Sequence, residues 1–172
     1  MKVGEPSGLL ILPYFSGSAT PYMDGNIRGA ILGICDDTTS IDIYQGLMEG
    51  VTYEMLLNLE YLKTAGIEVT ELRATGGGAR AEVWLQMKAD ILDKKIVTLG
   101  NAQSGTLGCI MMSGVACGAY RDLKEAAEIF VKPGKEYFPN KERHERYQQY
   151  YQKYKKLYPA VASVLKEEGN EK

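Results

Sequence analysis

The alternation of apolar and polar residues predicts short strands and amphipathic helices. Residues 9–15 and 29–34 are short apolar runs bounded by turn residues, which is typical of buried strands. Residues 16–28 between them are rich in Gly, Ser, Pro and Asp, so we expect an ordered loop. Residues 38–40 offer helix N-caps, and Gly66 offers a helix end. The apolar positions between these two signals recur every three or four residues and predict one long amphipathic helix: Ile43, Leu47, Val51, Met55, Leu59 and Leu62.

The middle of the chain alternates strand and helix patterns. Residues 69–74, VTELRA, and residues 95–99, KIVTL, predict two further strands. Three consecutive glycines follow the first of these strands and lead into a helix from about residue 79 to residue 92. Apolar residues at steps of four predict the buried face of this helix: Val83, Met87 and Ile91.

The last third of the chain is helical in pattern. Residues 104–120 contain four glycines, which would be costly in an exposed helix and therefore indicate very close packing. Asp122 can cap a short helix, and a polar helical tail covers residues 141–172. Since strand and helix alternate through the middle, we expect residues 1–172 to form a single α/β domain with a largely parallel sheet.

Charge and composition narrow the class of partner. The chain of 172 residues has a net charge of -2, so no basic field indicates binding to nucleic acid or to an anionic membrane. No apolar segment is long enough to span a bilayer. Three cysteines without a CxxC spacing indicate buried, reduced thiols, and we expect a cytoplasmic protein.

The glycine-rich connection in RATGGGARAEVWLQMKADIL, residues 73–92, is the strongest candidate for chemistry. A strand, a glycine turn and a helix together present backbone N–H groups and the positive end of a helix dipole, which suit a phosphate. Glycines also let a nucleotide lie against the backbone. The alternative is a tight connection that needs positive φ, and the spacing alone leaves both open, because GxGxxG and GK[ST] are absent.

Other side chains that could take part in catalysis or binding have simpler structural explanations. We expect Asp24, Asp36 and Asp37 to form loop turns and helix caps rather than a catalytic pair. His144, the sole histidine, lies in a charged run and is expected on the solvated surface. Five tyrosines recur at helical spacing near the C-terminus and predict a half-buried seam, with a ligand or partner surface as the alternative: Tyr147, Tyr150, Tyr151, Tyr154 and Tyr158.

Four ordered segments resemble the C-terminal domain of the FGGY family of carbohydrate kinases. Residues 8–34 carry a G-x-x-x-P-Y-x-D core, and residues 28–50 follow the second family pattern, with Gly46 where Ala or Ser is usual. Residues 73–92 resemble the adenosine-binding segment, and residues 104–120 resemble the small-residue helix that follows it. The residues that carry these matches include Gly17, Pro21, Tyr22, Asp24, Trp84, Gln86 and Asp90.

The resemblance implies an actin- and hexokinase-like ATPase fold, which is ribonuclease H-like, here without its first strands. It implies ATP as cofactor, with Mg²⁺ in the full-length kinase, and a xylulose-like sugar or polyol as acceptor. It places the ATP-binding turn on five residues, although Ala81 stands where relatives often have Ser or Asn: Gly76, Gly77, Gly78, Ala79 and Ala81.

The resemblance assigns no catalytic residue and no metal ligand to this sequence. The general base, the sugar pocket and the phosphate loops are expected elsewhere in the kinase, mainly in an N-terminal domain. We therefore expect the isolated chain to be inactive and to reach its sugar only through that domain. An uncovered strand edge and domain face favour a homo-oligomer. The alternative function is a non-catalytic binding or oligomerisation module that keeps the fold without the chemistry.

Overall fold

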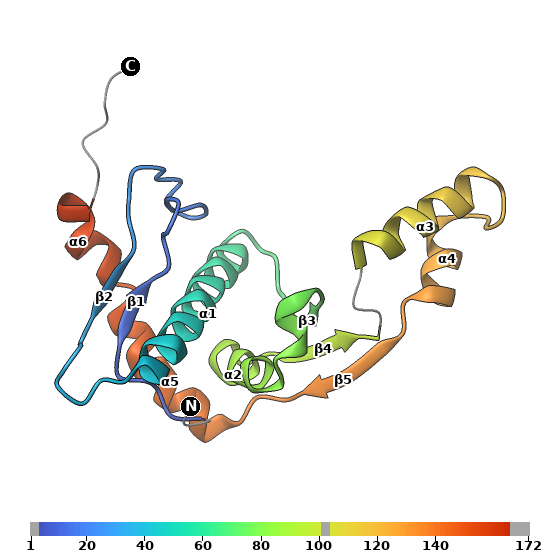
Figure 1. The fold of residues 1–172 in the computed structure, drawn as a ribbon. Helices are drawn as coiled ribbons and strands as arrows, with labels where there is room; N and C mark the ends of the chain where they lie inside the picture. The colour runs from blue at the N-terminus through green and yellow to red at the C-terminus, as the bar shows by residue number, and fades with distance from the viewer. Residues whose placement is uncertain (1–3, 101–103, 166–172) are drawn as a thin grey trace, which may run out of the picture. The chain divides into compact units, whose positions relative to one another are not determined.

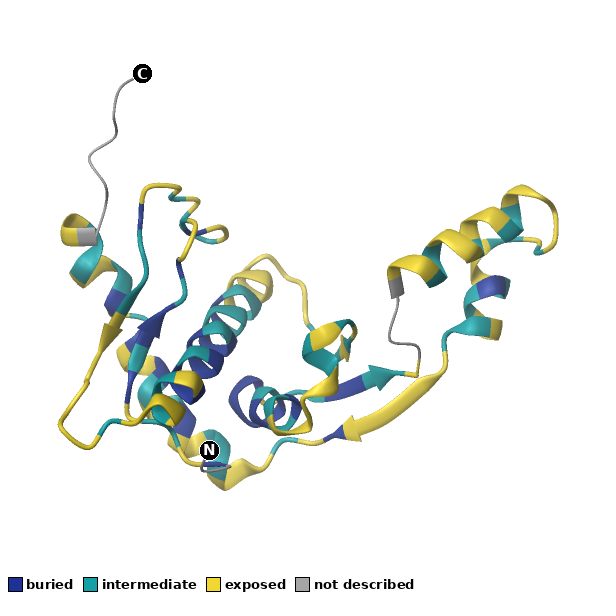
Figure 2. Ribbon diagram, viewed as in Figure 1, coloured by how far each residue is buried: buried dark blue, intermediate teal, exposed yellow. Residues whose placement is uncertain are grey.

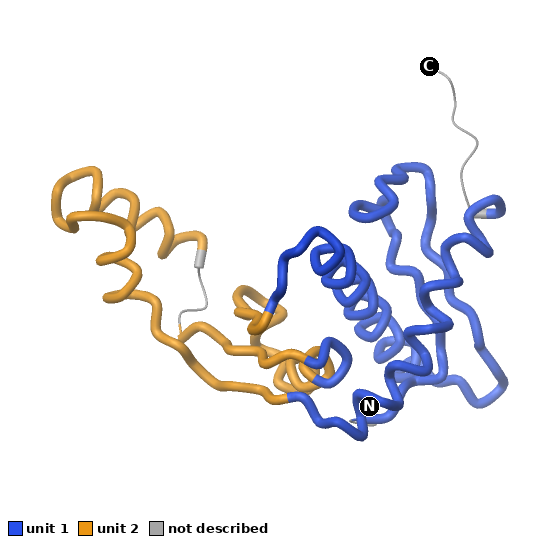
Figure 3. Tube along the Cα trace, turned by 180° about the vertical axis from the view of Figure 1, so that it is seen from behind, with its two compact units in different colours: residues 1–69, 90–93, 139–172 blue, residues 70–89, 94–138 orange. Residues whose placement is uncertain are grey.

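The computed structural model describes residues 4–100 and 104–165 (Figure 1), and the chain forms two compact units (Figure 3). Unit 1 comprises residues 1–69, 90–93 and 139–172, and unit 2 comprises residues 70–89 and 94–138. Within the described ranges, no helix combines the length and apolar composition needed to cross a bilayer.

Unit 1 is built on a short antiparallel pair of strands, β1 (Leu10–Leu12) and β2 (Ala30–Leu32). Both strands lie in the predicted apolar runs, and Ile11 on β1 is buried as expected. Ile31 and Leu32 on β2 are exposed, however, so the prediction of a buried second strand was wrong (Figure 2). Three helices complete the unit: α1 (Ser40–Thr64), α5 (Lys141–Tyr154) and α6 (Leu157–Leu165).

Helix α1 begins with a capping box, in which the Thr39 and Asp42 side chains each accept a backbone N–H from the other residue. Its buried face lies beside the predicted apolar stripe and combines the polar residues Gln45, Glu49 and Thr52 with three others: Met48, Tyr53 and Leu57. This face is buried because α1 packs closely against β1. A Cβ on Gly50 would collide with the carbonyl oxygen of Ile11.

A buried carboxylate explains the polar residues of this face. Both Glu49 oxygens accept hydrogen bonds from the Ser7 backbone N–H, at 2.9 and 3.2 Å, and the Ser7 hydroxyl donates at 2.7 Å. The Gln45 amide donates to Glu49 at 2.9 Å and to the Glu5 carbonyl at 2.6 Å. Burial raises the pKa of Glu49. These donors compensate for the removal of the carboxylate from water.

The predicted tyrosine seam is confirmed on α5. Tyr147, Tyr151 and Tyr154 are fully buried, and the rings of Tyr151 and Tyr154 lie 6.0 and 5.4 Å from the ring of Tyr53 on α1. The Tyr154 hydroxyl also donates a 2.8 Å hydrogen bond to Glu54. Aromatic packing therefore attaches the charged helix α5 to the body of unit 1.

Unit 2 contains a three-stranded sheet in the order β3 (Glu71–Ala74), β4 (Lys95–Leu99) and β5 (Pro133–Tyr137). The first pair is parallel, as predicted, and the second pair is antiparallel. The sequence did not predict β5. Its helices are α2 (Glu82–Leu92), α3 (Ser104–Ala116) and α4 (Leu123–Phe130), the last capped by Asp122 as predicted.

Helix α2 covers one face of this sheet. The core beneath it contains Leu85, Ala89, Ile96 and Tyr137, with Leu72 and Ala74 of β3 packed against them. Met87 and Ile91 are buried as predicted, but Val83 is 41% exposed, which corrects the predicted helix face. Helical geometry places Leu85 and Ala89 on one face, four residues apart, and the sheet buries that face.

Predictions about glycines and cysteines are also corrected. Within the described residues, a Cβ on Gly105 or Gly108 of α3 would meet open space, and only Gly114 is closely approached, by the Tyr120 ring. The helix also ends at Ala116 rather than near residue 120. All three cysteines, expected to be buried, are exposed free thiols: Cys35, Cys109 and Cys117.

Candidate nucleotide site at the glycine turn

The glycine turn connects β3 to α2 through one turn of 3-10 helix rather than directly. Gly76 has φ 76° and ψ -163°, and the 3-10 turn runs over Gly77–Arg80. The Ala79 N–H donates to the Gly76 carbonyl at 3.2 Å, and Leu85 donates to Ala81 at 3.0 Å. The α-helix therefore begins at Glu82 and not near residue 79 as predicted, because the glycines take a tighter turn first.

The structure separates the three glycines by what each one requires. Gly76 adopts a positive φ that residues with a Cβ rarely take, so the backbone alone explains its glycine. Gly77 and Gly78 do not lie in that region. Among the described residues, a Cβ on Gly77 would meet no atom within 4 Å, and one on Gly78 would lie 3.4 Å from the Trp84 ring. The tight-connection explanation thus accounts for Gly76 but leaves Gly77 without a structural reason.

The turn is accessible and carries no side-chain cap. Gly77 and Ala81 are exposed, and Gly76, Gly78 and Ala79 are partly exposed. No side chain caps the 3-10 turn at Gly76. Backbone N–H groups at an uncapped turn that leads into a helix are suited to an anion. All five predicted ATP-binding residues therefore lie together on one accessible turn.

Charged groups beside the turn were not singled out from the sequence. Glu82, at the start of α2, is paired with Lys135 at 2.9 Å, which offsets its negative charge. Lys88 lies over the Trp84 ring, with its Nζ 3.8 Å from the ring centroid. The four-residue spacing of Trp84 and Lys88 is the sequence signal that could have identified this pair.

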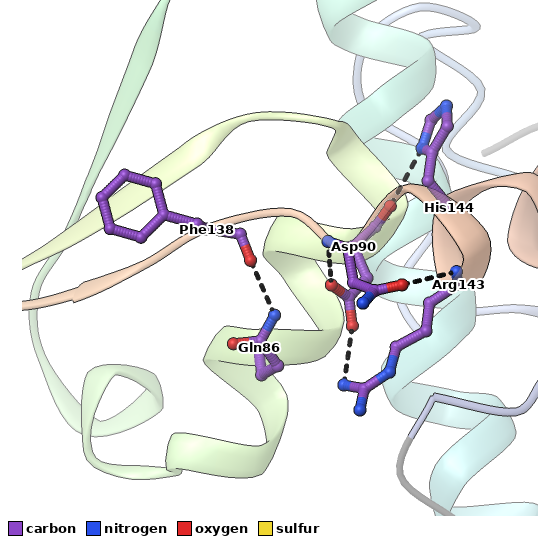
Figure 4. Close-up of polar contacts among 6 residues, drawn as sticks. Gln86, Asp90, Phe138, Arg143 and His144 are labelled. Carbon is purple, nitrogen blue, oxygen red and sulfur yellow. Dashed lines mark hydrogen bonds and ion pairs between the residues drawn. The ribbon is translucent and has the colours of Figure 1, made fainter.

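The other residues of the adenosine-like segment have structural roles. Gln86 donates a 2.9 Å hydrogen bond to the Phe138 carbonyl (Figure 4). Asp90 is 1% exposed in its side chain and accepts a hydrogen bond from the Asn140 N–H at 2.9 Å. It also lies 3.5 Å from the Arg143 guanidinium. The Asp90 contacts hold the end of α2 to the start of α5 within unit 1, whereas the Gln86 contact lies within unit 2.

His144 takes part in the same connection. Its Nδ1 lies 2.9 Å from the backbone carbonyl of Asp90 (Figure 4). The expectation of a solvated surface histidine is therefore corrected, because the first turn of α5 directs the ring toward α2. A single charged run gave no sign of this contact, since the partner lies 54 residues away in the sequence.

Asp24, one of the candidate carboxylates, takes part in loop contacts. Asp24 accepts a hydrogen bond from the Asn26 N–H at 3.1 Å, which is a loop turn as predicted, and another from the Tyr158 hydroxyl at 2.8 Å. Among the described residues, no group of three or more His, Cys, Asp and Glu side chains could hold a metal ion.

Replacing Asp90 with Asn should lower stability without changing nucleotide affinity. Asparagine keeps an oxygen for the Asn140 N–H but loses the charge opposite Arg143, and we expect a loss of about 1 kcal/mol in the free energy of unfolding. Urea unfolding measures this loss, and titration with ADP measures affinity. Weaker ADP binding by a folded Asp90→Asn variant would contradict the structural role.

Comparison with known proteins identifies the family. Residues 2–117 match the C-terminal domain of the FGGY family of carbohydrate kinases. The xylulose kinase of Staphylococcus epidermidis (strain ATCC 12228) is 33% identical over 144 residues, which cover 84% of this chain and 29% of that protein. Glycerol kinase 1 of Lactiplantibacillus plantarum is 32% identical over 130 residues, covering 75% of this chain and 26% of that protein. The chain therefore spans less than a third of these relatives.

Solved structures agree with this match. The ligand-bound xylulose kinase from Lactobacillus acidophilus is 29% identical with a TM-score of 0.81, and the match covers 94% of this chain and 33% of that chain. Plasmodium falciparum glycerol kinase with ADP is 20% identical with a TM-score of 0.72, over 95% of this chain and 32% of that chain, and supports the fold alone. The predicted actin- and hexokinase-like ATPase fold is thereby confirmed. The chain belongs to the FGGY family of carbohydrate kinases, whose C-terminal domain it matches.

Proposed function

We propose that this chain supplies the adenine-nucleotide-binding part of a kinase that transfers the γ-phosphate of ATP to a xylulose-like sugar or polyol. The observation that supports it is Gly77, which neither a positive φ nor a crowded neighbour requires to be glycine. A ligand that approaches the backbone of the turn supplies the missing reason. The xylulose and glycerol kinases among its relatives support the class of acceptor.

In this proposal the chain binds and orients the nucleotide. The residues of the turn, Gly76–Gly78 with Ala79 and Ala81, would present backbone N–H groups to the phosphates while the absence of side chains admits the nucleoside. Phosphoryl transfer depends on such positioning and on electrostatic stabilisation of the transferred group. ATP supplies that group when bound. We assign Mg²⁺, the sugar and the general base to the full-length kinase.

The proposal predicts that the 172-residue chain binds ADP but does not phosphorylate sugars. The chain supplies only part of the nucleotide site of the kinase, so it should bind ADP weakly, with a dissociation constant roughly in the millimolar range. Titration followed by amide NMR should shift the resonances of residues 76–81. A coupled ADP-release assay with xylulose, ribulose and glycerol should stay at the buffer blank, since phosphoryl transfer also needs a positioned base. ADP-dependent NMR shifts that avoid residues 76–81 would refute the site. Sugar phosphorylation by the isolated chain would refute the assignment of the general base to another part of the kinase.

A second candidate function is a non-catalytic binding or oligomerisation module. Exposed apolar side chains favour it, including Ile110 and Met112 on α3, which are 50% and 57% exposed. Light scattering combined with the ADP titration distinguishes the two, because a self-associating module has a mass above the 19.0 kDa of the monomer and does not bind ADP. Self-association without ADP binding would favour the module over the kinase part.

A further inference from the structure

Lys88 occupies an unusual place for a lysine. It lies on α2, one turn after Trp84, and its Nζ is 3.8 Å from the centre of the Trp84 ring. Helical side chains tilt toward the N-terminus of their helix, so the Lys88 stem reaches back toward the glycine turn. A Cβ on Gly78 would lie 3.9 Å from the Lys88 Nζ and 3.4 Å from the Trp84 ring. The ammonium therefore lies at the edge of the turn.

Within residues 4–100 and 104–165, no carboxylate forms an ion pair with Lys88. Lys95, on the same unit, lies 2.7 Å from Glu136 and 3.4 Å from Glu71, and Lys135 lies 2.9 Å from Glu82. Among the residues that the structure describes, Lys88 has no such ion pair, and its ammonium contacts the Trp84 ring instead. Its burial lowers the pKa of the ammonium group. A half-buried cation without a described counter-ion is costly, so an anion placed beside it would be stabilised.

We propose that the Lys88 ammonium contacts a phosphate group of the nucleotide bound at the glycine turn. This inference rests on the proposed function and names the residue that distinguishes a nucleotide from a nucleoside at that site. The Trp84 ring holds the ammonium against the turn by a cation–π contact, which orders the lysine before the ligand arrives. The phosphate then pairs with Lys88 in the way that a glutamate carboxylate pairs with Lys95 and with Lys135.

The alternative is a purely structural contact, in which Lys88 only covers the Trp84 ring. Lysine stems often cover apolar surface in this way. The two explanations differ in what they predict for the ligand. If the role of Lys88 is structural, its replacement changes the affinities for adenosine and for ADP equally, through the shape of the turn. If Lys88 binds a phosphate, its replacement changes the affinity for ADP alone.

The test titrates the chain and a Lys88→Met variant with ADP, with adenosine and with inorganic pyrophosphate. Trp84 is the single tryptophan, so its indole N–H resonance reports on this site. Methionine keeps an apolar stem over the ring and removes the charge. We expect Lys88→Met to weaken ADP binding about tenfold, because a hydrogen bond to a charged group is lost, and to leave adenosine binding unchanged. Lys88→Arg should retain ADP binding.

The matched control is Lys124→Met, which removes the same charge from an exposed site on α4. If Lys124→Met lowers the affinity for ADP as much as Lys88→Met does, the effect is one of general charge and the inference is overturned. Equal losses for adenosine and ADP in Lys88→Met, or no loss, would overturn it too. A pyrophosphate response in the wild type that Lys88→Met abolishes supports Lys88 even if no nucleotide binds, and that result would reject the proposed function separately.

Discussion

Replacing Gly77 with valine should abolish detectable nucleotide binding while leaving the fold intact. A Cβ at this position meets no atom of the described chain within 4 Å and its φ is not positive, so the turn tolerates a side chain there. The branched side chain would instead fill the space through which a ligand reaches the turn. We expect the ADP dissociation constant to rise by at least about tenfold, which corresponds to roughly 1.4 kcal/mol. Amide NMR titration of residues 76–81 measures it.

Two variants make this result specific. Gly108→Val introduces the same side chain into open space on α3 of the same unit and should leave ADP affinity unchanged. Gly76→Val should instead cost stability, because valine is strained at φ 76°. Unchanged ADP affinity in a folded Gly77→Val variant would mean that no ligand approaches this face of the turn. The proposal of a nucleotide site there would then fail.

The glycine turn was predictable because its residues are consecutive. A strand pattern, three glycines and a helix pattern are enough to place residues 76–81 on one connection. Its detail was not predictable, since the 3-10 turn over Gly77–Arg80 and the positive φ of Gly76 depend on local geometry. The role of Lys88 was only partly predictable from the sequence. Its spacing from Trp84 follows from helix geometry, but the lack of a described carboxylate partner depends on the whole unit.

Long-range contacts explain where the sequence misled. The buried face of α1 includes Gln45 and Glu49, whose partners Glu5 and Ser7 lie 40 and 42 residues away in the sequence. Apolar periodicity gives no weight to such polar residues. Strand β5, PGKEY, has little strand character of its own, and pairing with β4 imposes its conformation. Tertiary context overrode local preference in both cases.

The same buried face gives the largest expected effect on stability. Gly50→Ala should destabilise unit 1, because the new Cβ would collide with the Ile11 carbonyl oxygen, and a backbone atom cannot turn aside as a flexible side chain can. Overpacking of this kind costs up to about 3 kcal/mol. Alanine gains about 1 kcal/mol over glycine in helix propensity, so we expect a net loss of about 2 kcal/mol.

Gly108→Ala is the matched control for Gly50→Ala, because it makes the same substitution inside helix α3, where the described residues leave open space. Helix propensity acts there without a clash, so this variant should gain about 0.5 to 1 kcal/mol. Amide hydrogen exchange in α1 and β1 reports on unit 1, and fluorescence of Trp84, the single tryptophan, reports on unit 2. Opposite signs in the two variants would show that contact with β1, and not the loss of glycine itself, determines the outcome. Equal stabilisation by both would mean that α1 does not pack against β1 through Gly50.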